Sequence, residues 1–155
     1  MKTTEIKNGN IVLGIPEGFL ELSFQDIEKM GRTPEKNSWS IRNEKEHLIL
    51  EIAWKKAPFF SDFVKMETTA HFTEDRISKM IPTYKKESDI KKEIDGEEAC
   101  GFRYSYTVSD INMMADYLVL KHEKKYYSIS WIARKDTFSE SYDIFDSMMQ
   151  SFEFV

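Results

Sequence analysis

The residues that could carry nucleophilic or metal chemistry are few in this sequence, and they are scattered along it. One cysteine, Cys100, and three histidines, His47, His71 and His122, supply all the thiol and imidazole groups. A cysteine nucleophile needs a partly exposed, electropositive setting that lowers its pKa, and a neighbouring base that accepts its proton. A dyad of Cys100 with a histidine is therefore the sharpest enzyme hypothesis that these residue types allow.

The pattern around the cysteine argues against such a dyad. In the segment that follows Asp95-Gly96, Cys100 alternates in phase with Phe102 and Tyr104, which places it on the apolar face of a strand. A free thiol in that position behaves as a small hydrophobic side chain. The histidines fall near predicted turns or a helix start, where they are expected to face solvent or to make structural hydrogen bonds.

Acidic residues occur in close pairs, which could suggest general acid–base chemistry. The pairs are Glu97 with Glu98, Glu74 with Asp75, and Glu44 with Glu46. A glycosidase needs two carboxylates that face one cleft, whereas these pairs fall in predicted turns and in a helical segment, where acidic residues are usually solvated. The sequence also lacks a glycine-rich phosphate loop, a His-Glu-x-x-His motif, a Cys-x-x-Cys motif and a Gly-x-Ser-x-Gly motif. We therefore expect no catalytic residues, no metal site, no cofactor and no enzyme activity.

Two apolar stretches are candidates for binding a partner. In the first, Trp54-Lys-Lys-Ala-Pro-Phe59-Phe60, two adjacent phenylalanines follow a proline, so a simple strand pattern cannot bury both rings. They could form an aromatic rim that meets a partner. The preferred alternative is a loop that folds both rings over the sheet as a lid, because large apolar residues are usually buried. In the second stretch, Met113 and Met114 could border the same groove as the phenylalanines or fill gaps in the core.

Composition defines the class of molecule. The 155 residues are 41% hydrophobic and 32% charged, which predicts one globular domain over residues 1–155. A net charge of −5 gives no general attraction to nucleic acid or anionic lipid. No run approaches the ~18 apolar residues of a membrane span, so no stable membrane insertion is expected. The unpaired cysteine and the absence of an apolar signal stretch at the start predict a cytoplasmic, reducing location.

Periodicity predicts the elements that would position these residues. Alternating residues predict strands, as in 47–56, where Leu48, Leu50, Ile52 and Trp54 share one face. The predicted order begins with a strand over 10–15, a short helix from a Ser23 cap to Met30, and strands over 37–42 and 47–56. Helical character follows over 61–87, with a possible internal start at Thr73 and a break at Pro82. The chain continues with strands over 89–94, 98–108, 113–122 and 125–134, a helix opened by a Thr137–Glu140 capping box, and a closing strand over 152–155. Hairpins with segregated helices predict an α+β domain with one antiparallel sheet of about six to seven strands.

Four stretches carry a resemblance to a known family. They are Ile15-Pro-Glu-Gly-Phe19 after a first strand, Ile94-Asp-Gly-Glu-Glu-Ala-Cys-Gly-Phe-Arg-Tyr-Ser-Tyr106, Lys125-Tyr-Tyr-Ser-Ile-Ser130, and Tyr142-Asp-Ile-Phe-Asp-Ser-Met-Met-Gln-Ser-Phe-Glu-Phe154. In order and spacing the chain resembles the bacterial PsbP-like and DcrB-like proteins, which share the fold of the MOG-type Ran-binding proteins. The resemblance implies a bacterial source and an antiparallel sheet flanked by helices. It departs from the lipoprotein branch, since no lipobox cysteine or signal segment is seen.

Members of that group are mostly non-catalytic: a photosystem subunit, Ran-binding proteins, envelope lipoproteins and effector chaperones. The resemblance therefore implies a binding or adaptor domain that engages a protein partner through the sheet face or an aromatic rim. In one version of this role, the domain is a chaperone for an apolar segment. The residues expected at that surface are Trp54, Phe59, Phe60, Met113 and Met114. The alternative is a small-molecule carrier with a pocket between sheet and helix. An enzyme that uses the thiol or a histidine is the last hypothesis.

Overall fold

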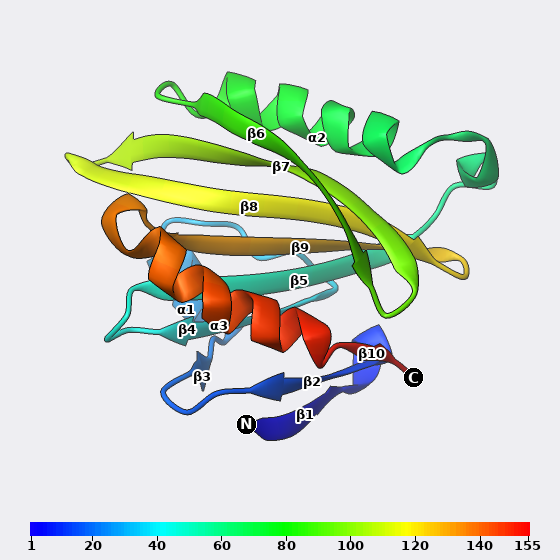
Figure 1. The fold of residues 1–155 in the computed structure, drawn as a ribbon, viewed down its shortest axis with the longest axis horizontal. Coiled ribbons are helices and arrows are strands. Elements are labelled where there is room, and N and C mark those ends of the chain that lie inside the picture. The colour runs from blue at the N-terminus through cyan, green and yellow to red at the C-terminus, as the bar shows by residue number, and fades with distance from the viewer.

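The computed structural model describes residues 1–155 and contains two antiparallel sheets (Figure 1). The large sheet has the strand order β3-β4-β5-β9-β8-β7-β6. Its strands are β3 (Leu20–Glu21), β4 (Ser38–Asn43), β5 (Leu48–Lys56), β6 (Lys85–Ile94), β7 (Glu97–Val108), β8 (Ile111–His122) and β9 (Lys125–Arg134). The small sheet has the order β1-β2-β10, formed by β1 (Lys2–Ile6), β2 (Ile11–Ile15) and β10 (Glu153–Phe154).

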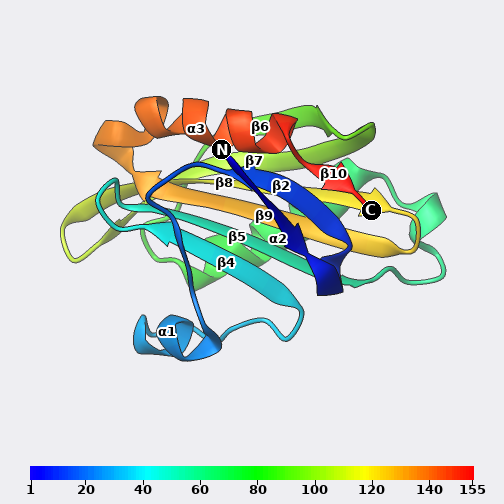
Figure 2. The ribbon, with the colours of Figure 1, turned by 90° about the horizontal axis from the view of Figure 1, so that it is seen from below.

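Helices cover both faces of the large sheet. The three α-helices are α1 (Phe24–Lys29), α2 (Met66–Met80) and α3 (Phe138–Gln150), and single 3₁₀ turns occur at η1 (Lys7–Gly9), η2 (Ser61–Phe63) and η3 (Lys135–Thr137). Figures 1 and 2 show α3 and the small sheet on one face, with α1 and α2 on the opposite face. The predicted α+β class with an antiparallel sheet of about six to seven strands is confirmed, since the large sheet has seven. The first predicted strand and the closing strand, however, belong to the separate small sheet.

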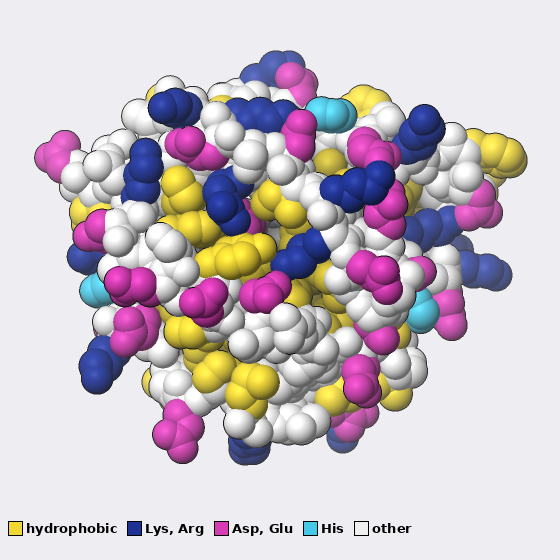
Figure 3. All heavy atoms as spheres, in the orientation of Figure 1, with side chains coloured by type: hydrophobic (Ala, Val, Ile, Leu, Met, Phe, Trp, Pro, Cys, Tyr) yellow, Lys and Arg dark blue, Asp and Glu magenta, His cyan; other side chains and the backbone are white.

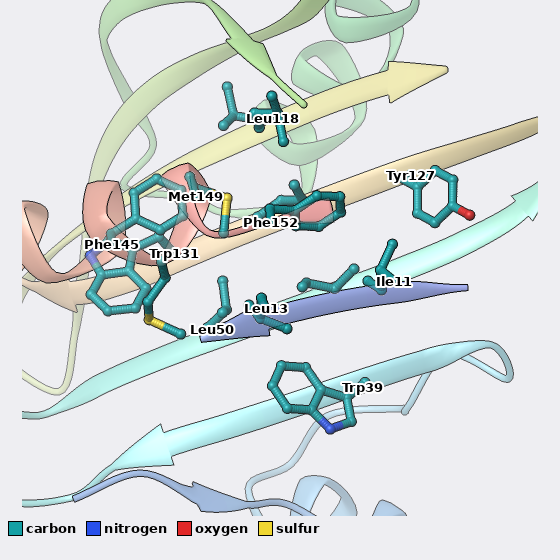
Figure 4. Close-up of a cluster of buried hydrophobic side chains, with 14 of the residues drawn as sticks. Ile11, Leu13, Trp39, Leu50, Leu118, Tyr127, Trp131, Phe145, Met149 and Phe152 are labelled. Carbon is teal, nitrogen blue, oxygen red and sulfur yellow. The ribbon is translucent and has the colours of Figure 1, made fainter. Parts of the chain in front are cut away.

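The main core lies between the large sheet and the layer made by α3 and the small sheet. The predicted inner faces of β5 and β9 are confirmed, because their alternate residues are buried in this core. Trp131 on β9 stacks against Phe145 of α3, with 5.1 Å between ring centroids. Figure 4 shows side chains of β2, β4, β5, β8, β9, α3 and the turn after α3 that converge there, among them Ile11, Leu13, Trp39, Leu50, Leu118, Trp131, Phe145, Met149 and Phe152.

The helix-start predictions had mixed outcomes. The Ser23 hydroxyl accepts the Asp26 amide hydrogen, and the Ser23 amide donates to the Asp26 carboxylate, so a capping box opens α1 as predicted. The Thr137 capping box is wrong. The Thr137 hydroxyl donates to the Arg134 carbonyl in η3, and no side chain caps the start of α3. Thr73 lies in the middle of α2 and begins no helix.

The helical prediction over 61–87 extends too far at both ends. Before Met66 the chain forms only the η2 turn, and after Met80 the helix ends at Ile81, which has extended dihedrals of φ −108° and ψ 108°. A residue that precedes a proline, here Pro82, is sterically driven out of the helical region. Strand β6 then begins at Lys85, four residues before the predicted start, because the first five residues of this edge strand are all exposed and show no alternation.

None of the three helices combines the length and apolar character that a membrane crossing requires.

Candidate functional site

The most exposed apolar surface of the chain lies in the connection between β5 and α2. Strand β5 ends at Lys56, and the next residue, Ala57, is buried and donates its amide hydrogen to the Lys124 carbonyl at 2.8 Å. The chain then turns outward at Pro58. Three phenylalanines follow, Phe59, Phe60 and Phe63, and we call them the phenylalanine rim.

The side chains of the phenylalanine rim point into solvent. Phe59 is 94% exposed, Phe63 is 90% exposed and Phe60 is 50% exposed. The rings of Phe59 and Phe60 pack edge to face, with centroids 5.4 Å apart and an interplanar angle of 82°. In Figure 3, hydrophobic side chains stand out at the right-hand edge, where Figure 1 places the β5–α2 connection. The prediction that this loop folds over the sheet as a lid is therefore wrong.

The backbone beneath the rim is held in place by short-range hydrogen bonds. The Ser61 amide donates to the Pro58 carbonyl at 3.0 Å, and the Phe63 amide donates to the Phe60 carbonyl at 3.0 Å. Ser61 itself is 5% exposed. The carboxylate of Asp62 pairs with the ammonium group of Lys121 on β8. The loop is thus tied to the sheet through main-chain contacts and one ion pair, and its aromatic rings are left free.

Trp54 does not belong to this surface. Its indole is 9% exposed and packs in the main core, where it lies against the backbone of Gly9. A Cβ on Gly9 would lie 3.1 Å from the Trp54 ring, so a larger residue there would push against the indole. Trp54 therefore supports the start of the loop from below and is not available to a partner.

Met113 and Met114 lie at the opposite end of the sheet from the rim. Lys56, at the end of β5, pairs with Lys125 at the start of β9, whereas Met113 pairs with Arg134 at the end of β9. Ten residues of extended strand separate the two ends, which is roughly 30 Å. The two methionines are half-buried and pack into different clusters on opposite faces. The predicted groove bordered by both pairs is not formed.

Cys100 lies on the apolar face of β7, as predicted, and is 3% exposed. Burial raises the pKa of its thiol to about 11, and the carboxylates of Glu67 and Glu98 contribute in the same direction. The thiol is therefore protonated at neutral pH, which is the opposite of what a nucleophile requires. The ligand atoms of Cys100, Glu67 and Glu98 lie within 4.8 Å of one another, but the Lys91 ammonium already contacts both carboxylates, at 3.3 and 3.5 Å.

The space between α2 and the sheet is small and charged. A cavity of about 200 Å³ lies there, and His71 shares its wall with Cys100. The imidazole contacts Glu74, with 3.4 Å between Nδ1 and the carboxylate. The remaining lining includes Glu67 and Lys91, and the volume falls below the range of roughly 300–1,000 Å³ that is typical of pockets for drug-sized ligands. The geometry therefore gives the small-molecule carrier little support. A second cavity, of about 380 Å³, lies beside α1 at the β3 edge, but five of its eight lining residues are charged, whereas ligand pockets are mostly apolar; the lining is Leu20, Glu21, Leu22, Asp26, Lys29, Met30, Arg42 and Glu44.

Sequence reasoning missed Phe63 as a member of the rim. The helical prediction over 61–87 includes Phe63, although this residue lies in the run Lys55-Lys-Ala-Pro-Phe-Phe-Ser-Asp-Phe-Val-Lys65. The proline and the Ser-Asp pair in that run are turn residues and were the signal that the helix starts later. With Phe63 included, two rings of the phenylalanine rim are at least 90% exposed, those of Phe59 and Phe63.

No family model matches this sequence, and the comparison with curated proteins also gave no match. The fold, in contrast, matches solved structures over nearly the whole chain. The PsbP protein of the cyanobacterium Synechocystis aligns with a TM-score of 0.71 and 14% identity, over 99% of this chain and 92% of that one. The Ran-binding protein Mog1p of Saccharomyces cerevisiae gives 0.63 and 10%, over 99% and 95%. LpqN of Mycobacterium tuberculosis, described as involved in cell envelope biogenesis, gives 0.62 and 10%, over 97% and 88%.

These similarities confirm that the chain has the fold of PsbP and the MOG-type proteins, as the sequence motifs predicted. At 10–14% identity they show the fold alone. The DcrB-like part of the resemblance stays a prediction.

Proposed function

We propose that this chain is a non-catalytic binding domain that engages a protein partner through the phenylalanine rim. The observation that carries the proposal is the exposure of Phe59 and Phe63, at 94% and 90%, in a protein whose aromatic side chains otherwise mostly fill the cores. Burying a phenylalanine side chain stabilises a complex by roughly 1.5–3 kcal/mol before the costs of association. Clustered aromatic side chains of this kind are typical of binding hot spots.

The rim is a better binding surface than the sheet face. Both faces of the large sheet carry helices, and α3 together with the small sheet closes the main core (Figures 1 and 2). The phenylalanine rim needs no rearrangement before a partner can reach it. A protein-binding role also suits the fold, because Mog1p, which shares the fold, is a Ran-binding protein. A chaperone role for an apolar segment is one version of this function, and a cytoplasmic location is consistent with the free Cys100.

The test compares a double variant, Phe59→Ser with Phe63→Ser, with the wild-type protein in affinity purification from native lysate followed by mass spectrometry. A matched control is Phe72→Ser, because Phe72 lies on the outer face of α2, away from the rim, and is 72% exposed. All three proteins should unfold within about 3 °C of one another, since exposed residues contribute little to stability.

The proposal expects one stoichiometric partner with the wild type and the control, and none with the double variant. Retention of the same partner by the double variant would overturn it. A large loss of stability in the double variant would mean that the rings pack against the fold, and would also contradict the proposal.

A further inference from the structure

Lysines surround the phenylalanine rim, although the chain as a whole carries a net charge of −5. Lys55 and Lys56 lead into the rim, and Lys65 follows it. Lys124 lies beside it, because its carbonyl accepts the amide hydrogen of Ala57 at 2.8 Å. The side chains of these four lysines are exposed.

None of these four ammonium groups has a carboxylate partner in the folded protein. The lysines Lys86 and Lys91 of strand β6 differ in this respect, because each forms ion pairs with two carboxylates. The rim segment itself contains one acidic residue, Asp62, and its charge is already matched by Lys121. The local surface is therefore aromatic at its centre and positive at its edge.

We infer that the partner presents an acidic, apolar segment, in which large hydrophobic side chains cover the phenylalanine rim and flanking carboxylates meet Lys55, Lys56, Lys65 and Lys124. The inference rests on the proposed function and specifies the chemistry of its partner. Apolar contacts supply the affinity, while charge complementarity at the edge orients the segment and selects against basic sequences.

A protein segment fits this surface better than an anionic membrane does. A membrane presents a wide negative plane that would also meet Glu123, which is exposed in the turn next to Lys124, and the rest of a molecule with net negative charge. A segment is small enough to lie over the rim and its four lysines, where Glu123 is the neighbouring acidic residue. Screening over about 8 Å at physiological salt weakens the repulsion from the more distant acidic surface.

The test measures binding of fluorescein-labelled 16-residue peptides by fluorescence anisotropy. One amphipathic peptide carries leucine and phenylalanine with glutamate, a second carries lysine in place of glutamate, and a third carries serine in place of the apolar residues. The proteins are the wild type, the rim variant (Phe59→Ser with Phe63→Ser), the charge variant (Lys56→Glu with Lys124→Glu) and a control reversal at Lys79→Glu, at the far end of α2. Vesicles of phosphatidylcholine with one quarter phosphatidylglycerol serve in parallel.

The expected result is that the wild type and the control bind the acidic apolar peptide at least about tenfold more tightly than either of the other peptides, a difference of about 1.4 kcal/mol. The charge variant should lose that preference, and the rim variant should lose binding altogether. If the rim variant loses binding while the charge variant keeps the wild-type order, the inference fails and the proposed function stands. If neither variant changes peptide binding, both fail. Rim-dependent binding to the vesicles without peptide binding would assign the surface to lipid and overturn the inference.

Discussion

Arg103 on β7 and Asp116 on β8 lie directly opposite each other and form a two-point ion pair across the strands. Arg103 Nε donates to Asp116 Oδ1 at 2.7 Å, and its Nη2 donates to Oδ2 at 2.9 Å. The Asp116 side chain is 1% exposed. The guanidinium also lies 4.7 Å from the ring centroid of Phe138 and 5.0 Å from that of Tyr142. One pair of charges therefore joins two neighbouring strands to helix α3.

Removing one member of this pair should be strongly destabilising. In Asp116→Ala the guanidinium would remain half-buried without its carboxylate, and the expected loss is about 3–5 kcal/mol in the free energy of unfolding. Urea denaturation measures it. The matched control is Asp75→Ala, which removes an ion pair with Lys79 on the exposed face of α2 and should cost less than about 1 kcal/mol. Equal losses in the two variants would contradict this account.

Glu74 should make the protein less stable in acid. Burial acts to raise the pKa of its carboxyl group, but hydrogen bonds from Tyr84 at 2.8 Å and Lys86 at 3.1 Å outweigh burial, so the pKa lies below its usual value of 4.5. A carboxyl whose pKa is lower in the folded state stabilises the protein above its unfolded pKa, and this contribution is lost as the pH falls through the folded pKa.

The measurement is the stability of the wild type and Glu74→Gln between about pH 7 and pH 3. The wild type should lose more of its free energy of unfolding over this interval than the variant does, and the two curves should converge at the acid end. Parallel curves would show that Glu74 is not a source of the acid sensitivity.

Cys100 should react slowly with thiol reagents in the folded protein. The side chain is 3% exposed and its pKa is raised to about 11, so little thiolate forms near neutral pH and the reagent has little access. Because the pKa is raised on folding, the thiol contributes stability below its usual pKa of 9.0, and this is lost as the pH rises towards 11. Labelling should be at least about a hundredfold faster in denaturant than in buffer. Equal rates in both would contradict the buried position.

Gly101 should tolerate no side chain. A Cβ at this position would lie 1.7 Å from the carbonyl oxygen of Tyr117 in the neighbouring strand β8, and backbone atoms cannot move aside cheaply. Overpacking of side chains alone costs about 1–3 kcal/mol, so Gly101→Ala should exceed that range or prevent folding. Gly14→Ala is the control, because its nearest neighbour is the Ser151 hydroxyl at 3.3 Å. Thermal unfolding of both variants checks the prediction, which a fully stable Gly101→Ala protein would refute.

The sequence predicted best those elements whose pattern follows from burial on one side. In β9 the alternation of Tyr127, Ile129, Trp131 and Ala133 arises because one face of the strand lies in the main core, and all four are buried. The turn at Asp95-Gly96 was equally clear, since both residues adopt positive φ, at 44° and 82°, which favours this pair of residues.

The predictions that were wrong or missing share a physical cause: contacts between residues distant in sequence determine the structure at those positions. The first five residues of the edge strand β6 are all exposed, so no core face imposes a period on them, and the helical prediction over 61–87 extends into them. Phe59 and Phe60 turn outward directly after Ala57, where the backbone is hydrogen-bonded to Lys124, a residue distant in sequence that no local pattern points to. The ion pair of Arg103 with Asp116 depends on the strand register, which no local pattern around either residue specifies.

The small sheet brings together segments from opposite ends of the chain. Strand β2 pairs with β1 on one side and with β10 on the other, with Val12 opposite Glu153 and Ile11 opposite Phe154. During synthesis, a ribosome delivers β2 long before β10, so the nascent chain cannot complete this ladder until β10 has left the exit tunnel. Ile11 and Leu13, which are fully buried in the folded protein, should lack part of their cover until then, and exposed apolar surface of this kind favours aggregation.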